Sequence, residues 1–167
     1  MTHAENKVEW CLTKAEKEGR KHKGLRVVKP DVTQSACHVA KADHSISLIP
    51  LMIERKAGDW AVSMAFYAQY HSLLAVLWKF GYESKNQTCT IAAVELLIEQ
   101  GKIDLTKEDI ERIWRTKEEN EHDRTDLVTL RERFQYGTET TTEETFLLGL
   151  LQETKEFVEK CKTLLEV

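Results

Sequence analysis

The sequence predicts an all-α protein, an up-and-down bundle of four or five helices with an extra N-terminal helical arm. Hydrophobic residues make up 41% of the chain and charged residues 31%, which is the balance of a folded protein. Only 7 Gly and 2 Pro are present, too few for the turns of a many-stranded β architecture. Apolar residues recur at steps of three and four, and no segment sustains the alternation typical of strands.

A chain of 167 residues can bury one core, and the sequence predicts two parts around it. Residues 1–30 are expected to form an N-terminal helix and a basic linker, and residues 31–167 the helical bundle. No apolar run reaches the roughly 18 residues that cross a bilayer. The polar start MTHAENKVEW lacks the layout of a signal peptide. We therefore expect a cytoplasmic protein with no membrane partner.

The first two helices are separated by the basic segment RKHKGLRVVK. The first is expected at about residues 4–19, with an apolar face and a stop at Gly19. The second opens at Pro30 and Asp31 and is expected to end at Gly58. Because proline lacks an N–H and crowds the preceding turn, we expect Pro50 to kink or break this helix.

The third helix, from Asp59 as its expected cap to Gly81, contains the run AFYAQYHSLLAVLWKFG. Apolar residues occupy nearly every side of it, which indicates the centre of the bundle. Tyr67 and His71 are four residues apart and so share a face. Two roles remain open for this pair, hydrogen-bonded packing against a neighbouring helix, which is the commoner case, or part of a binding site.

The remaining elements follow from spacing and caps. They are a loop at ESKNQTC, a helix over Thr90–Glu99, a helix capped by Thr106 and Asp109 that runs through Ile113 and Trp114, a helix containing Leu127 and Phe134 that stops at Gly137, and a final amphipathic helix from about Thr142. The segment TKEENEHDRTD has no apolar residue, and its sequence fits either a protruding exposed helix or a loop.

The cysteines Cys11, Cys37, Cys89 and Cys161 are far apart and show no CxxC spacing. The spacing therefore indicates neither a zinc site nor a disulfide framework, and buried free thiols are expected. The histidines also lack ligand spacing, so no metal and no cofactor are expected.

Charge is distributed unevenly along the chain. Residues 1–29 hold eight Lys/Arg against four Glu, whereas residues 102–126 hold six Lys/Arg against nine acidic residues. The basic arm could meet phosphates, or it could be a solvated linker.

The stretch LRERFQYG places Arg131 and Arg133 on one helix near Tyr136. A guanidinium donates two parallel hydrogen bonds to a phosphate, so either arginine could bind one. The alternative is that both are surface arginines flanking Phe134. No Gly-rich phosphate loop or nucleophile elbow is present.

Taken together, GDWAVSMAFYAQYHSLLAVLWKFGYESKN followed by LRERFQYG and a long final helix resembles the HEPN domains, in particular their stand-alone prokaryotic members. The resemblance covers about residues 36–165. It implies a HEPN-type bundle that forms a homodimer, associates with RNA or nucleotides, and works with a nucleotidyltransferase-type partner in a toxin–antitoxin or stress system. The binding residues it suggests are Arg131, Arg133, Lys85, His71 and Tyr67.

Many HEPN domains are metal-independent ribonucleases with an arginine–histidine motif. By this resemblance Arg131 matches the motif arginine, and Tyr136 stands where an active member has histidine. An ordinary tyrosine has a pKa of about 10, so only about one in a thousand is ionised at neutral pH. Arg131 and Tyr136 are thus the candidate catalytic pair, but Tyr136 makes a poor base. Endoribonuclease activity and a non-catalytic interaction module are the two alternatives to RNA or nucleotide binding.

Overall fold

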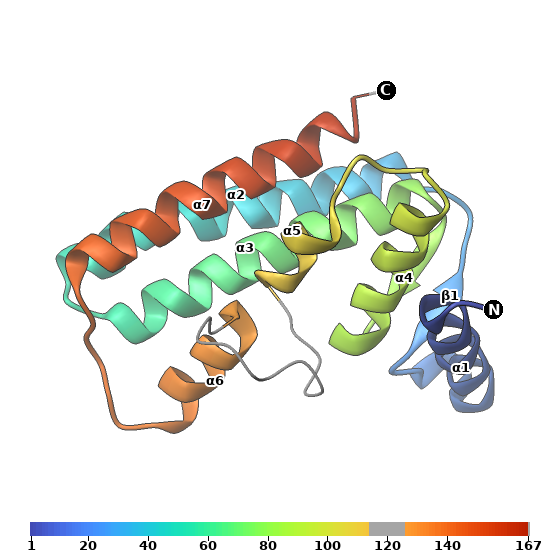
Figure 1. Cartoon of the computed structure of the whole chain (residues 1–167), viewed down its shortest axis with the longest axis horizontal. Helices are drawn as coiled ribbons and strands as arrows, with labels where there is room; N and C mark the ends of the chain where they lie inside the picture. The colour runs from blue at the N-terminus through green and yellow to red at the C-terminus, as the bar shows by residue number, and fades with distance from the viewer. Residues whose placement is uncertain (114–125, 167) are drawn as a thin grey trace.

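In the computed structural model, helix α3 (Gly58–Lys79) lies at the centre of a helical bundle (Figure 1). Thirteen of its 22 residues are buried. Four helices pack against it: α2 (Val32–Glu54), α4 (Gln87–Glu99), α6 (Leu127–Tyr136) and α7 (Glu144–Thr163). The structure describes residues 1–113 and 126–166. The all-α prediction is confirmed, and none of the helices so described is long and apolar enough to cross a membrane.

Helices α2, α3 and α7 form the long layer of the bundle and run beside one another in Figure 1. The chain reverses between α2 and α3 in a tight turn, where Lys56 adopts a positive φ of 57°. Helix α7 has the clean stripe that its sequence predicts, and its buried residues are Leu147, Leu150, Leu151, Thr154, Phe157, Val158 and Cys161.

The N-terminal arm packs against the bundle. Helix α1 (His3–Glu18) leads through the short 3₁₀ helix η1 (Gly19–Lys21) into strand β1 (Leu25–Val27). A capping box between Thr2 and Glu5 starts α1, and the Thr2 hydroxyl also donates to Glu99 of α4 at 2.7 Å. The buried face of α1 lies against α4.

Two short strands, which the sequence did not predict, join arm and bundle. β1 pairs antiparallel with β2 (Tyr82–Ser84), with Leu25 opposite Ser84. β2 falls partly in the predicted loop, and each strand has only three residues, too few to show alternation. Gly81 precedes β2 with a φ of 79°, and a Cβ there would lie 2.8 Å from the carbonyl oxygen of Val28. Only glycine fits this position without strain.

Two helix details differ from the sequence predictions. Helix α2 continues through Pro50, so the predicted break is wrong; proline near the C-terminus removes a single helical hydrogen bond, and packing against α3 maintains the helix. Asp59 is not the cap of α3: the N-cap is Ala57, without a side-chain hydrogen bond, and Asp59 lies in the first turn, where its charge favours the positive helix end.

The capping box predicted at Thr106 and Asp109 is confirmed at the start of the short helix α5 (Lys107–Glu111). The backbone N–H of Leu127 donates to the Arg112 carbonyl at 3.0 Å, which joins the start of α6 to the end of α5. The predicted passage through Trp114, and all but the last residue of TKEENEHDRTD, lie outside the described residues.

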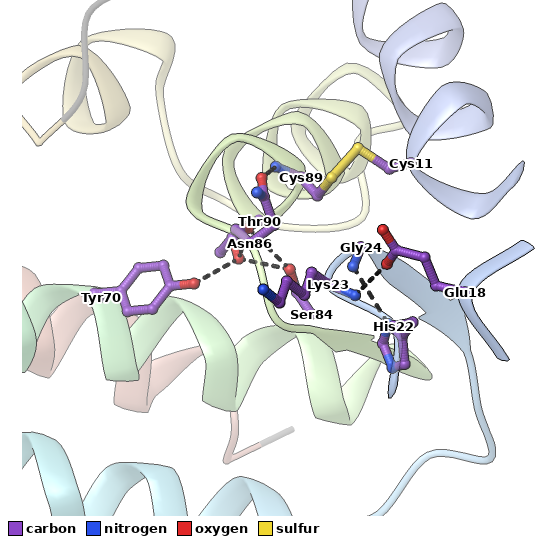
Figure 2. The surroundings of a disulfide bond; sticks show 10 residues. All are labelled: Cys11, Glu18, His22, Lys23, Gly24, Tyr70, Ser84, Asn86, Cys89 and Thr90. Atoms are coloured by element: carbon purple, nitrogen blue, oxygen red, sulfur yellow. Dashed lines mark hydrogen bonds between the residues drawn. A yellow bond between two sulfur atoms is a disulfide. The ribbon is translucent and has the colours of Figure 1, made fainter. Parts of the chain in front are cut away.

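The expectation of four buried free thiols is wrong. Cys11 of α1 and Cys89 of α4 form a disulfide with their Cα atoms 5.8 Å apart (Figure 2). The two positions are 78 residues apart, and only the packing of α1 on α4 brings them together. Cys37 is exposed, while Cys161 is a buried free thiol whose pKa burial raises to about 12.

We expect Cys11→Ser to lower the free energy of unfolding by about 4 kcal/mol, because a cross-link over this loop length restricts the unfolded chain. Denaturant unfolding with and without a thiol reductant would measure it. Wild type and a Cys37→Ser control should both lose stability on reduction, whereas Cys11→Ser should not respond. A reductant effect that persisted in Cys11→Ser would contradict the assignment.

Candidate functional site around Arg131

Arg131 lies on the inner face of α6, although arginine is usually a surface residue. Its side chain is 10% exposed, and its guanidinium carbon lies 4.4 Å from the centre of the Phe66 ring on α3. This distance is within the range of a cation–π contact. The α3–α6 packing therefore determines where the charge of Arg131 lies.

The guanidinium of Arg131 is incompletely satisfied. Its Nε is the one buried side-chain nitrogen or oxygen without a hydrogen-bond partner among the described residues. The carboxylate of Glu132 is 3.9 Å from Nη2, beyond hydrogen-bond distance. A buried donor left unpaired costs on the order of 1–3 kcal/mol. Because Nε is closed to solvent in this conformation, an anionic oxygen would recover that energy once a movement of the side chain exposes Nε.

The other two candidates on α6 face solvent. Arg133 is 64% exposed and forms an ion pair with Glu139, with Nη2 and Oε2 2.9 Å apart. Tyr136 is 79% exposed. Five residues along a helix correspond to a rotation of about 140°, so Tyr136 and Arg131 project from different sides of α6. The structure does not bring this predicted catalytic pair together within one chain.

Tyr67 lies closer to Arg131 than its sequence position suggests. Its ring meets Phe66 edge-on at a centroid distance of 5.4 Å, so Tyr67 and the Arg131 guanidinium both contact the Phe66 ring. Tyr67 is 38% exposed. Tyr70 also stacks on Phe66, but its hydroxyl pairs with Thr90 of α4 at 3.1 Å, and burial raises its pKa although that hydrogen bond opposes the rise. Tyr70 therefore has a packing role, while Tyr67 borders solvent.

His71 pairs with His38 of α2, a partner that sequence reasoning did not select. The two Nδ1 atoms are 2.9 Å apart and the rings are stacked. One Nδ1 must carry a proton and the other must accept it, so at most one of the two rings can be positively charged. Burial, then the charges of His38 and Lys41, lowers the pKa of His71 to about 4, and burial lowers the pKa of His38.

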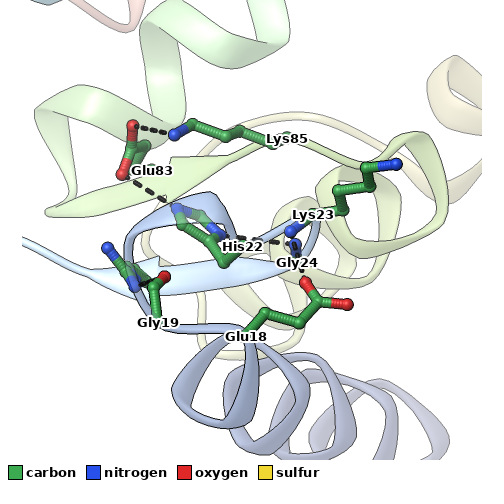
Figure 3. A network of polar contacts seen from close by, with 8 residues as sticks. Glu18, Gly19, His22, Lys23, Gly24, Glu83 and Lys85 are labelled. Atoms are coloured by element: carbon green, nitrogen blue, oxygen red, sulfur yellow. Dashed lines mark hydrogen bonds and ion pairs between the residues drawn. The ribbon is translucent and has the colours of Figure 1, made fainter.

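Lys85 belongs to a different part of the molecule. It follows β2, and its ammonium is 3.4 Å from Glu83, which also contacts the buried His22 at 3.2 Å (Figure 3). Burial raises the pKa of Glu83, but the hydrogen bonds and charges of His22 and Lys85 outweigh it and lower the pKa overall. In Figure 1 this network lies near α1, at the end of the molecule away from α6. Lys85 thus stabilises the joint between arm and bundle and is not brought to Arg131.

The described residues contain no group of three or more His, Cys, Asp or Glu side chains that could hold a metal ion. Two important contacts were missed by sequence reasoning, Phe66 beneath Arg131 and His38 beside His71. Both Phe66 and His38 lie on helices that the sequence predicts. Which residues they meet on the neighbouring helix depends on how α2, α3 and α6 pack together, and the sequence pattern does not specify that.

By its fold and its site, the protein is an all-α bundle with one buried central helix. A short helix packs a buried arginine against that central helix. The sequence model of the HEPN domain family matches residues 37–165, well over half of the chain. The chain belongs to the HEPN domain family. A comparison with curated proteins found no significant match.

The His38–His71 pair predicts a pH dependence of stability. In the unfolded chain a histidine binds its proton near pH 6.5, whereas folded His71 does so only at about 4. The contribution of His71 to the free energy of unfolding is therefore fully present above about pH 6.5 and is lost as the pH falls towards 4. We expect His71→Asn to show a shallower decline than wild type in urea unfolding across this range. His44→Asn, an exposed site on α2, is the matched control and should retain the wild-type slope.

Proposed function

We propose that this HEPN-domain protein binds RNA or nucleotide phosphate through Arg131 and does not cleave RNA. The observation that supports the proposal is the buried, unpaired Nε of Arg131 over Phe66. Ion–phosphate hydrogen bonds are stronger where water is excluded, and Arg131 already has its side chain held in place. Folding has therefore already fixed most of this side chain, and binding a phosphate costs little further conformational entropy.

Among the described residues, neither sequence-predicted candidate base is placed to act beside Arg131, and this supports binding over cleavage. Attack of a ribose 2′ hydroxyl on the adjacent phosphate needs a group that removes its proton. Tyr136 projects away from Arg131 into solvent. His71 is engaged with His38, and with a pKa lowered to about 4 it is a weak base. Arg131 alone supplies charge stabilisation without proton transfer.

Arg131→Met is expected to weaken binding of the dinucleotide UpA at low salt by about tenfold, since hydrogen bonds to charged groups contribute roughly 1.5–3 kcal/mol. Methionine retains the contact with Phe66 and removes the charge. The matched control is Arg133→Met on the same helix, which should bind UpA like wild type. Isothermal titration across a salt series would measure all three proteins.

Equal losses in the Arg131 and Arg133 variants would contradict the proposal, because they would indicate a general charge effect. The same proteins also test the ribonuclease alternative. RNA incubated with wild type in excess chelator should remain intact. Cleavage that disappeared in Arg131→Met would establish a metal-independent ribonuclease instead.

The proposal includes a homodimer formed through the solvent-facing side of α3. Trp60 is 58% exposed and Tyr67 38% exposed, and seven residues along a helix return to the same side. Two large aromatic side chains left in solvent on the most buried helix suit a protein contact. A second copy there would contact Tyr67, whose ring packs against the buried Phe66 beside Arg131. The same observation supports the alternative of a non-catalytic interaction module.

Trp60→Glu combined with Tyr67→Glu should convert the dimer to monomer in sedimentation equilibrium, because two charges would be buried at the contact. Leu148→Glu, an equally exposed apolar position on α7, should leave the dimer intact. A wild-type protein that is monomeric at micromolar concentration would contradict the homodimer.

The wider setting rests on the resemblance of the central helix and LRERFQYG to stand-alone prokaryotic HEPN proteins. We extend the proposal to a partner that carries a nucleotidyltransferase domain, within a cytoplasmic toxin–antitoxin or stress system. A neighbouring gene for a small nucleotidyltransferase, and co-purification of the two products, would support that assignment.

A further inference from the structure

Helix α1 has three distinct sides. Its buried side, Ala4, Val8, Cys11 and Ala15, packs on α4. A second side carries the acidic residues Glu5, Glu9 and Glu16. The third, which we name the basic face, consists of Lys7, Trp10, Lys14 and Lys17, spaced by three, four and three residues. The basic face spans about 15 Å of helix. Glu18, four residues beyond Lys14, lies at its edge, where its carboxylate accepts a hydrogen bond from the backbone N–H of Lys23.

Trp10 is the centre of the basic face. It is 52% exposed, although its large ring could have been buried. The Lys7 ammonium lies 4.6 Å from the ring centre and that of Lys14 5.2 Å. None of the three lysines on this face forms an ion pair with any residue that the structure describes. Lys7 and Lys14 lie over the ring, so a base that stacks on Trp10 must displace an ammonium group from it, and that group can then pair with a phosphate.

The arm is basic in an otherwise acidic chain. Residues 1–29 hold eight of the 24 Lys/Arg residues but four of the 28 Asp/Glu residues. Helix α1 itself holds three lysines and four glutamates, and the other five cations lie in residues 20–29, which contain no acidic residue. The rest of the chain therefore has a large excess of acid. An anionic ligand would be repelled by most of the protein and attracted to this end of it. Figure 1 places α1 at the end of the molecule opposite α6, so the basic face is separate from Arg131.

The anchoring of α1 distinguishes between anionic partners. A membrane-surface helix needs a free apolar face to insert, but the apolar face of α1 is buried against α4 and cross-linked to it through Cys11. A single nucleic-acid strand needs what the basic face presents, cations for consecutive phosphates and an exposed ring for a base. A duplex has its bases stacked internally and could not use Trp10.

We propose that the basic face of α1 is a binding site for single-stranded nucleic acid, with a base stacked on Trp10 and phosphates on Lys7, Lys14 and Lys17. The site lies outside residues 37–165, which match the HEPN family, and it does not require Arg131. It gives the protein a second nucleic-acid contact at the far end of the bundle.

The test uses the full oxidised protein and a fluorescein-labelled oligouridylate of about 12 nucleotides. Replacing Lys7, Lys14 and Lys17 by Ala should weaken binding at least tenfold at low salt. It should also reduce the slope of log affinity against log salt by about 2, since each phosphate contact on a single strand contributes about 0.7. The charge-matched control replaces Lys102, Lys107 and Lys155, all exposed and outside α1, and should bind like wild type.

Trp10→Ala should weaken binding about tenfold with the salt slope unchanged, because stacking of one base contributes roughly 1–3 kcal/mol. Wild-type tryptophan fluorescence should be quenched by the oligouridylate, and the part due to Trp10 should be lost in this variant. All these positions are on the surface of α1, and unchanged circular dichroism would establish that the variants are folded.

Three results would overturn the proposal. They are equal losses in the two triple variants, duplex RNA bound as tightly as the single strand, and lysine-dependent binding to phosphatidylserine vesicles without binding to the oligouridylate. The triple lysine variant should weaken oligouridylate binding in the Arg131→Met background as well as in wild type, whereas the loss of UpA binding follows Arg131 alone. Failure at α1 and failure at Arg131 therefore remain distinguishable.

Discussion

The burial of α3 on several sides is the constraint on which the rest of the structure depends. A helix that is apolar nearly all round must be enclosed, and α2, α4, α6 and α7 supply the enclosure. The few polar groups that enter with it must then find partners on those helices, because unpaired polar atoms in a core are costly. Gln69 donates to Thr154 of α7, and Tyr70 pairs with Thr90 of α4. These hydrogen bonds therefore help to fix the position of α4 and α7 along α3.

Arg131 departs from that pattern, and the departure gives it functional interest. Packing against Phe66 places its guanidinium within the α3–α6 contact, yet no neighbouring acceptor among the described residues satisfies Nε. A fold selected only for stability would gain from an apolar side chain there. The unpaired donor destabilises the fold. Such a cost is tolerated at functional sites, where a ligand or a second subunit can supply the missing acceptor oxygen.

Sequence reasoning predicted the helical class, the central place of α3, the capping box at Thr106 and a helix that ends at Gly137, because each depends on local spacing. It could not predict the Cys11–Cys89 disulfide or the His38–His71 pair, since both depend on helices meeting across 78 and 33 residues. Rotation along α6 separates Arg131 from Tyr136, although they are five residues apart in the sequence. The basic face of α1 could have been predicted from the sequence, because its lysines and Trp10 follow helical spacing. Counting only the total charge of the arm did not separate this face from the rest of the helix.

The cross-link also has a topological consequence. With Cys11 bonded to Cys89, the polypeptide from residue 11 to residue 89 forms a closed covalent ring that contains all of α2 and α3. A protease that cut one peptide bond anywhere in this ring would open it without releasing a fragment. The N-terminal arm would therefore stay attached to α4 even when the chain between them was severed, and the two would separate only after reduction.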